Sequence, residues 1–343
     1  SQPAFRGDRV RARLDGPTTA RLEKLARDAR GSLFVALLAG FEVVLHRWSG
    51  QPDLVLGMAL SGRPAAESAG LVGYFVNTLP LRARLSLRTP LAEALEAARE
   101  EAVGALERQT VPLPWLASRL EPQRDPHRSP LFQALVVYQK LPRAVDPGLA
   151  AFAVGAQGTR VRLGGLELET LELPERSSQL DLSLFAAEVD GALCLALQFD
   201  ADLWDRATAQ RLLGHLAEAL ADLAARPEAT VGELRLLSAA ERQQLAWEWN
   251  DTEVATPAGA ALSLHGGFER QAEEVPERVA LVAGEEHWSY RELDQWAGRL
   301  AGALRRRGVG SEERVGVLLE RGPLRLLALL GVLKAGGCYV PLS

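Results

Sequence analysis

A continuously apolar segment, Leu54-Val55-Leu56-Gly57-Met58-Ala59-Leu60, is the feature that most constrains the fold. Seven residues without a polar side chain are too few for a membrane span, and they lack the alternation of a strand that faces water on one side. Such a run is typical of a strand that is covered on both faces. A helix over residues 33–46 is predicted just before it, with Ser32 as N-cap and Gly50 as terminator. We therefore expect a sheet with helices packed on it, an α/β architecture.

The rest of the first part of the chain alternates between predicted helices and predicted strands. Thr18 and Thr19 offer N-caps for one helix, and Asp205 caps a later one. The dipeptide Asp190-Gly191 between two apolar runs predicts a tight hairpin. The other predicted elements cover residues 74–85, 90–108, 112–120, 132–139, 166–173, 180–189 and 192–199. Residues 1–226 are thus predicted to form one α/β unit.

A charged connector follows residue 226. Ser238, with Glu241 three residues later, predicts a capping box at the start of a helix. Trp247 and Trp249 at its end are expected to anchor that helix against its neighbours, because large aromatic side chains dominate such contacts. Strands and helices then alternate over residues 264–335, which predicts a second unit with a parallel sheet and crossover helices.

The composition limits the class of partner and the compartment. The 343 residues carry 39 basic and 44 acidic side chains, a formal net charge of −5, so a basic nucleic-acid-binding surface is not expected. No apolar stretch reaches the roughly 18 residues of a membrane span. Cys194 and Cys338 both lie in apolar runs and are predicted to be buried small hydrophobic residues. We expect a cytoplasmic protein with no nucleic-acid and no membrane partner.

The sequence lacks the patterns of a self-contained catalytic centre. Its five histidines, His46, His127, His215, His265 and His287, do not pair at the spacings that metal ligands use. The patterns H-E-x-x-H, C-x-x-C, G-x-x-x-x-G-K-[ST] and G-x-S-x-G do not occur. No catalytic residue and no metal ligand is therefore predicted in this chain.

Several segments nevertheless carry recognisable patterns. The clearest are G-M-A-L-S-G-R-P at residues 57–64 and L-V-G-Y-F-V-N-T-L-P-L-R at residues 71–82. Weaker patterns follow at residues 108–113, 124–133, 178–182, 234–252, 288–293 and 333–342. In content and order they closely resemble the nonribosomal peptide synthetases, at the passage from a condensation domain into an adenylation domain. One departure is His127, which stands where the family usually has serine.

The resemblance covers essentially the whole chain and implies three parts. Residues 1–226 are similar to the second lobe of a condensation domain, a chloramphenicol-acetyltransferase-like α/β lobe with a mixed sheet and flanking helices. Residues 227–257 resemble the interdomain linker, and residues 258–343 the partial α/β N-terminal subdomain of an adenylate-forming enzyme. A synthetase of this kind forms peptide bonds between carrier-bound thioesters and activates an amino acid with ATP and magnesium, as in antibiotic biosynthesis.

The same resemblance implies that both catalytic centres lie outside these residues. The condensation motif H-H-x-x-x-D-G does not occur here, and Lys334 belongs to the second adenylation motif rather than being the catalytic lysine. The implied partners are the first condensation lobe, the rest of the adenylation domain and carrier domains with their phosphopantetheine arms. We expect the chain alone to bind no cofactor, to be inactive, and to expose apolar surface where these partners pack.

In the family, the second lobe lines a tunnel in which two phosphopantetheine arms meet. The resemblance implies four candidates for this wall, namely Ser61, Arg63, Asn77 and Ser178. Each has a structural alternative: Asn77 would hold a loop, because a buried amide must be hydrogen-bonded. Arg63 would pair with an acidic side chain, and Ser178 would serve as a cap or turn residue.

Two hypotheses from other classes remain beside this one. The chain would be a non-catalytic scaffold or binding module related to the condensation fold, or a complete acyltransferase with an unfamiliar site. The absence of a histidine pair argues against the acyltransferase. The flanking reading frame would separate the three, because an upstream H-H-x-x-x-D-G identifies the synthetase.

Overall fold

The computed structural model describes residues 6–63, 67, 71–120, 129–140, 147–171, 173–174, 176–253 and 263–342. The chain divides into two compact units, Ser1–Asn250 and Asp251–Ser343. His127 and most of the pattern at residues 124–133 lie outside the described residues.

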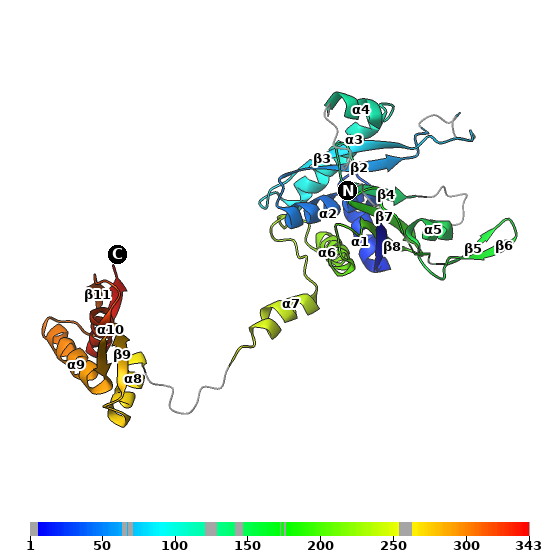
Figure 1. The fold of residues 1–343 in the computed structure, drawn as a ribbon. Helices are drawn as coiled ribbons and strands as arrows, with labels where there is room; N and C mark the ends of the chain where they lie inside the picture. The colour runs from blue at the N-terminus through cyan, green and yellow to red at the C-terminus, as the bar shows by residue number, and fades with distance from the viewer. Residues whose placement is uncertain are drawn as a thin grey trace. The chain divides into compact units, whose positions relative to one another are not determined.

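A six-stranded mixed sheet organises the first unit (Figure 1). Its order is β1-β8-β7-β4-β2-β3; β4 runs parallel to β2 and β7, and the other neighbours are antiparallel. The strands are β1 (Gly7–Leu14), β2 (Asp53–Leu60), β3 (Asn77–Arg84), β4 (Ala134–Gln139), β7 (Leu182–Val189) and β8 (Ala192–Asp200). The apolar run at 54–60 is β2, as predicted, and it lies between two other strands.

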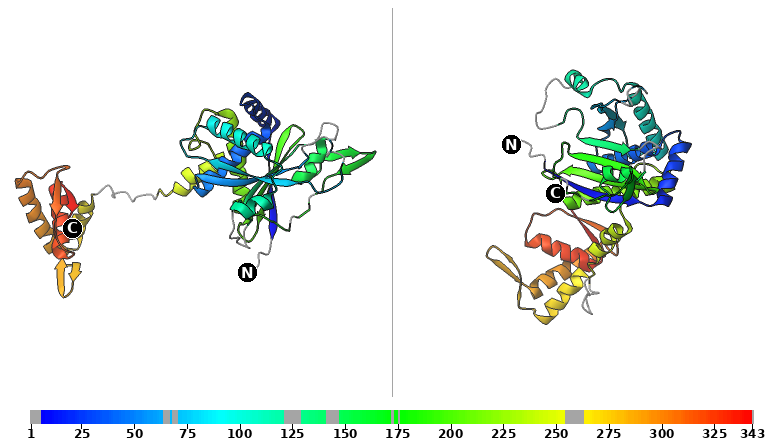
Figure 2. Two further views of the ribbon diagram at one scale, coloured as in Figure 1. Left: turned by 90° about the horizontal axis from the view of Figure 1, so that it is seen from above. Right: turned by 90° about the vertical axis from the view of Figure 1, so that its right-hand side faces the viewer.

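Helices cover both faces of this sheet. One face carries α1 (Gly16–Asp28), α2 (Leu33–Ser49), α3 (Leu91–Glu107) and α6 (Arg206–Ala225), and the other carries the short α5 (Ala150–Val154). Smaller elements are α4 (Leu113–Leu120), the 3₁₀ turn η2 (Pro147–Leu149) and the hairpin β5 (Arg160–Leu163) with β6 (Leu166–Glu169). Figure 2 shows this hairpin projecting from the body of the first unit. The mixed α/β fold predicted for this part is confirmed.

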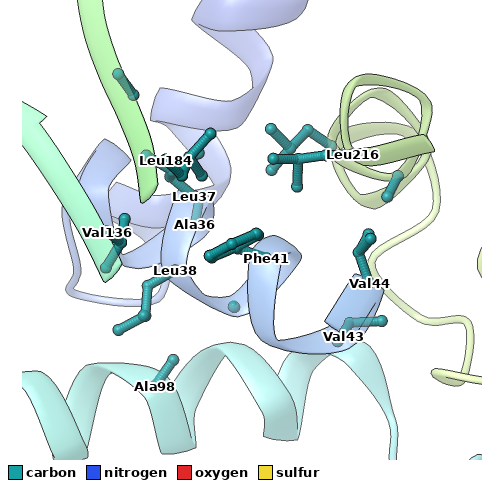
Figure 3. Packing of buried hydrophobic residues seen from close by; sticks show 14 of the residues in the cluster. Ala36, Leu37, Leu38, Phe41, Val43, Val44, Ala98, Val136, Leu184 and Leu216 are labelled. Carbon is teal, nitrogen blue, oxygen red and sulfur yellow. The ribbon is translucent and has the colours of Figure 1, made fainter. Parts of the chain in front are cut away.

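The main core lies between the sheet and α2. Phe41 and Leu37 of α2 are 1% and 0% exposed. They lie among Leu216 of α6, Val136 of β4 and Leu184 of β7 (Figure 3). Burial of one such side chain stabilises the fold by about 2 kcal/mol. The central helix is therefore held from several elements at once.

Local signals explain where several elements begin and end. Asp190 and Gly191 have φ of 51° and 72° between β7 and β8, as a two-residue hairpin turn requires, so the predicted hairpin is confirmed. The Asp205 carboxylate accepts from Thr208 N and caps α6, and Gly50 closes α2 in the left-handed conformation. The N-cap expected at Thr18 or Thr19 is wrong, because the Asp15 carboxylate caps α1.

The strand β1 was missed in the sequence. Its core-facing residues, Val10, Ala12 and Leu14, alternate with arginines at 9, 11 and 13, which is the period of a strand with one buried face. It pairs with β8 over eight residues and closes one edge of the sheet. The cation-rich half of the pattern hid the alternation.

The linker helix α7 (Ala239–Ala246) begins with the predicted capping box and passes into the 3₁₀ turn η3 (Glu248–Asn250). Trp247 and Trp249 are 59% and 65% exposed within this structure. The prediction that they anchor the helix is therefore wrong for the first unit. The start of the helix is what holds it, as described below.

The second unit contains two small sheets. The strand β9 (Val279–Ala283) pairs antiparallel with β10 (Glu286–Ser289), and β11 (Arg314–Val317) pairs parallel with β12 (Cys338–Pro341). The helices are α8 (Leu264–Glu274), α9 (Tyr290–Arg306) and α10 (Pro323–Ala335). The parallel pair with its crossover helix α10 confirms half of the predicted arrangement, and the antiparallel hairpin β9–β10 corrects the other half. Cys338 is exposed, so its predicted burial is also wrong.

Candidate functional site

The end of β2 and the segment before β3 lie against each other. Gly62 has φ of 64°, and a Cβ at this position would lie 1.6 Å from the carbonyl oxygen of Phe75. Only glycine therefore permits this close approach. The contact places residues 61–63 beside residues 73–77, and it joins the two patterns that the sequence singled out.

Arg63 strengthens the same contact. Its guanidinium carbon lies 4.3 Å from the centre of the Phe75 ring, and Nη2 donates to the carbonyl of Gly73 at 3.2 Å. A cation over an aromatic face contributes about 0.5–1 kcal/mol at an exposed site. Arg63 thus orients the segment before β3.

Asn77 begins β3 and bridges to a loop far along the chain. Its Nδ2 donates to the carbonyls of Gln109 and Val111, both at 2.9 Å, and its Oδ1 accepts from the backbone N–H groups of Thr78 at 3.0 Å and Leu113 at 3.4 Å. Both amide hydrogens are used by backbone carbonyls. The side chain therefore fixes the loop between α3 and α4 against the start of β3, which is the loop-holding alternative.

A cavity of about 360 Å³ opens where these segments meet. It is lined by Gly62, Tyr74, Phe75, Val76, Asn77, Gln109, Thr110 and Pro112. Tyr74 and Val76 are 88% and 45% exposed, and the neighbouring Val72 is completely exposed. An apolar wall with a few amides suits a flexible chain that carries both methylene and amide groups.

The other two candidates lie elsewhere. Ser61 is exposed at the end of β2 and is not one of the residues that line the cavity. Ser178 is 2% exposed, and its hydroxyl donates to the carbonyl of Leu180 at 2.7 Å, as a turn residue does. It lies close to the backbone of Gly7 in β1, at the opposite edge of the sheet from β3. The structure therefore brings Arg63 and Asn77 together and separates Ser178 from them.

A polar chain that sequence analysis missed attaches the linker helix to the first unit. Trp48 Nε1 donates to His215 Nδ1 at 3.1 Å, so Nδ1 is the acceptor and the proton of the neutral ring lies on Nε2, 3.2 Å from Glu241 Oε1. The other oxygen of Glu241 accepts from the backbone and hydroxyl groups of Ser238. Burial raises the pKa of Glu241, but the hydrogen bonds from Ser238 and His215 outweigh it and hold this pKa below its usual range.

Arg47 at the end of α2 fixes the preceding stretch. Its Nη1 donates to the carbonyls of Val231, Gly232 and Leu234 at 2.8, 3.0 and 3.3 Å. The segment between α6 and α7 is thus attached to the helix layer. A capping box predicts only its own local hydrogen bonds, so these long-range partners had no signal in the sequence.

Metal and membrane features are limited in the part of the chain that the structure describes. No group of three or more His, Cys, Asp or Glu side chains there could hold a metal ion. No single described helix is long and apolar enough to cross a bilayer; the pair α1–α2, bent by 99°, meets the criterion only when joined.

Family models match both parts of the chain. The condensation-domain model matches residues 1–246, and the AMP-binding enzyme model matches residues 268–343. One of the plipastatin synthase subunits of Bacillus subtilis (strain 168) is 34% identical over 340 residues, 99% of this chain and 9% of that protein. One of the linear gramicidin synthase subunits of Brevibacillus parabrevis is 35% identical over 334 residues, 96% of this chain and 4% of that protein. The chain thus spans less than a tenth of either relative.

Solved structures agree with these matches. A four-domain nonribosomal peptide synthetase, solved in its holo form with AMP and glycine, superimposes with a TM-score of 0.77 at 26% identity, over 100% of this chain and 26% of that one. The X-domain from teicoplanin biosynthesis superimposes with a TM-score of 0.58 at 23% identity, over 69% of this chain and 51% of that one, which shows the fold alone.

Proposed function

Since the chain belongs to the condensation-domain family of the modular nonribosomal peptide synthetases and continues into an AMP-binding segment, we propose that its first unit forms one wall of a peptide-bond-forming site. In that reaction the amine of a carrier-bound acceptor attacks the carbonyl carbon of a carrier-bound donor thioester. The carbon–sulfur bond breaks, and the released thiolate takes up the proton that the amine loses. The base that helps the amine would come from the H-H-x-x-x-D-G motif of the first lobe.

The contact of Asn77 with the loop at 109–111 is the observation that carries this proposal. Asn77 acts as a positioning residue, because it sets the distance between two sides of the cavity. Arg63 orients the aromatic side through Phe75. Ser61 lies at the rim, and Ser178 supports the lobe through its local turn.

The implied cofactors differ in how well these residues fit them. The 360 Å³ cavity, with aromatic and amide groups, suits part of a phosphopantetheine arm that arrives as cargo on a carrier domain. Nothing comparable is present for ATP or magnesium: the described residues hold no cluster of metal ligands, and the sequence contains no G-x-x-x-x-G-K-[ST] loop to cradle phosphates. We assign ATP and magnesium to residues outside this chain.

The proposal includes the remaining organisation. Residues 1–226 act as the second condensation lobe, 227–257 as linker, and 258–343 as the beginning of an adenylation domain. The partners are the first condensation lobe, the rest of the adenylation domain and carrier domains, and the place of action is the cytoplasm. The support is the order of the matched family models along the chain.

Complementation tests the proposed function. The 343-residue chain alone should neither condense carrier-bound substrates nor exchange pyrophosphate with ATP, because general-base groups contribute about 10²- to 10⁴-fold and are not present. Joined to a first lobe that carries H-H-x-x-x-D-G, it should form the peptide bond. Product from the chain alone, or none from a folded joined protein, would contradict the proposal.

A further inference from the structure

A second cavity, of about 320 Å³, lies at the other edge of the sheet. It is enclosed by β1, by the end of α5 with the residues after it, and by the β7–β8 hairpin. Four strands separate β1 from β3, so roughly 20 Å of sheet lies between this cavity and the one beside Asn77. Its polar lining residues are Arg11, Arg13, Gln157, Thr159, Asp190 and Cys194.

The strand register builds the floor of this cavity. Val10 and Leu14 of β1 face the main core, so the arginines at 11 and 13 lie on the opposite face of the sheet. Arg13 is paired with Cys194 of β8, which places the guanidinium beside the thiol. The helix α5 covers the neighbouring alanines of β7 and β8 and ends at Val154, so the sheet beyond it stays open.

The cavity gathers polar groups that the fold does not use. Arg13 and Gln157 are exposed, and neither side chain has a hydrogen-bond or ion-pair partner among the residues described in this structure. Arg11 is fixed in place, because its Nε donates to the carbonyl of Val154 at 3.3 Å. Two guanidinium groups face one carboxylate, that of Asp190, so the local charge is positive.

The thiol is not suited to covalent chemistry. Burial raises the pKa of Cys194, and although Arg13 acts in the opposite direction, the pKa stays above its usual range. A thiol in this state is a poor nucleophile at neutral pH. The cavity is therefore a binding site rather than a reactive one, and its apolar part consists of Val154, Val189 and the Cys194 side chain.

We propose that this cavity binds a small organic carboxylate with a short apolar chain. The planar fork of an arginine matches a carboxylate, and the amide of Gln157 supplies a further donor. The apolar residues would contact the chain of the ligand. A volume of 320 Å³ is at the lower end for ligand sites, which favours a small molecule. The site would be separate from peptide-bond formation.

Cys194 provides a reporter in the whole chain. The sequence has only two cysteines, so the exposed Cys338, changed by Cys338→Ser, leaves one thiol to alkylate. The rate of alkylation by iodoacetamide at alkaline pH is then measured with hexanoate, hexanol, acetate or inorganic phosphate. With Kd of about 1 mM, about 10 mM hexanoate fills about 90% of the sites and slows alkylation about tenfold.

Matched variants decide whether the cavity acts as proposed. Arg13→Gln should weaken the protection by hexanoate about tenfold, and Arg88→Gln, an exposed arginine before α3, should leave it unchanged. Acetate, hexanol and phosphate should protect far less than hexanoate. The proposal is overturned if hexanol protects as well as hexanoate, if phosphate alone protects, if Arg13→Gln keeps full protection, or if no probe protects.

Discussion

The two units alternate strands and helices alike, yet they bury very different cores. In the first unit, side chains from four helices and a six-stranded sheet form one continuous cluster. In the second unit, as far as the structure describes it, the fully buried cluster consists of Leu293, Ala297 and Leu330. Its exposed large side chains include Trp296 and Leu324, at 50% and 63%. The first unit is stabilised by packing, and the second must rely more on polar contacts.

One polar contact in the second unit shows how this works. Lys334 of α10 has a side chain that is 11% exposed, and its Nζ lies 2.7 Å from Glu269 of α8 and 2.6 Å from Asp294 of α9. Burial lowers the pKa of Lys334, but the hydrogen bonds to the two carboxylates raise it above its usual range. The charge thus joins three helices that share a small core.

The largest effect should come from a cavity in the first core. Phe41→Ala should cost the first unit about 3–5 kcal/mol, because Phe41 is 1% exposed and a cavity would remain. Trp296→Ala in the second unit, at an exposed side chain that lies beside Arg299, should cost less than about 1 kcal/mol. Urea unfolding followed by hydrogen exchange in each unit measures both. Equal costs would show that the contrast in packing is not real.

A charge buried inside the first core should act next. Glu42 of α2 is 3% exposed, Oε1 has no hydrogen-bond partner among the described residues, and burial with the nearby Glu101 raises its pKa to about 8. The folded state therefore binds the proton more tightly, so the stability is fully present below pH of about 4.5 and falls as pH rises to about 8. Glu42→Gln should raise stability at pH 7, by on the order of 3 kcal/mol.

A pH series of unfolding measurements checks this sign. The wild-type chain should lose stability between pH 5 and 8 by about the amount that the substitution recovers, and Glu42→Gln should flatten that slope. Glu93→Gln, at an exposed position of α3, serves as the control and should keep the slope. A slope that is unchanged in Glu42→Gln would mean that Glu42 is ionised in the folded state.

The polar junction of the second unit should have a smaller effect. Lys334→Met removes the charge between two partly exposed carboxylates and should cost the second unit about 2 kcal/mol. Arg291→Met breaks a pair with Glu277 in which both side chains are more than half exposed, and should cost less than about 1 kcal/mol. Protection of α10 from hydrogen exchange distinguishes the two. If Arg291→Met costs as much as Lys334→Met, the position of Lys334 among three helices has no special role.

The smallest effect should appear at the start of the linker helix. Glu241→Ala removes the capping box and the contact with His215, at a cost of about 1 kcal/mol that falls mainly on α7. Hydrogen exchange of α7 should become faster while α6 is unchanged. Glu248→Ala, in the exposed turn that follows α7, is the matched control, and equal acceleration by both variants would argue against the attachment.

Local signals in the sequence predicted the fold of the first unit well. The helix α2, the buried strand β2 and the hairpin at Asp190-Gly191 depend on neighbouring residues and were predicted correctly. Burial at the ends of elements depends on what lies across them, so the burial of Cys338 and the anchoring by Trp247 and Trp249 were wrong. No local pattern reports such contacts.

The site shows the same division. The patterns around Arg63 and Asn77 identified the right segments, and glycine at 62 explains why they meet. The partners of Asn77 are carbonyls 32 and 34 residues further along the chain, so its loop-holding contacts follow only from the tertiary structure. For the same reason His215, 26 residues before Glu241, was expected to be an ordinary packed core histidine.

Turnover of a complete synthetase that contains these residues tests the central claim most directly. Asn77→Ala should lower the rate of peptide-bond formation per folded molecule by at least about tenfold, because the loop at 109–111 loses both of its hydrogen bonds. The matched control is Asn250→Ala, since Asn250 also donates its amide to a backbone carbonyl, that of Leu245, but lies in the linker. The account predicts a normal rate for this control. Equal turnover of the two variants, with both folded, would contradict the role of Asn77 in the wall.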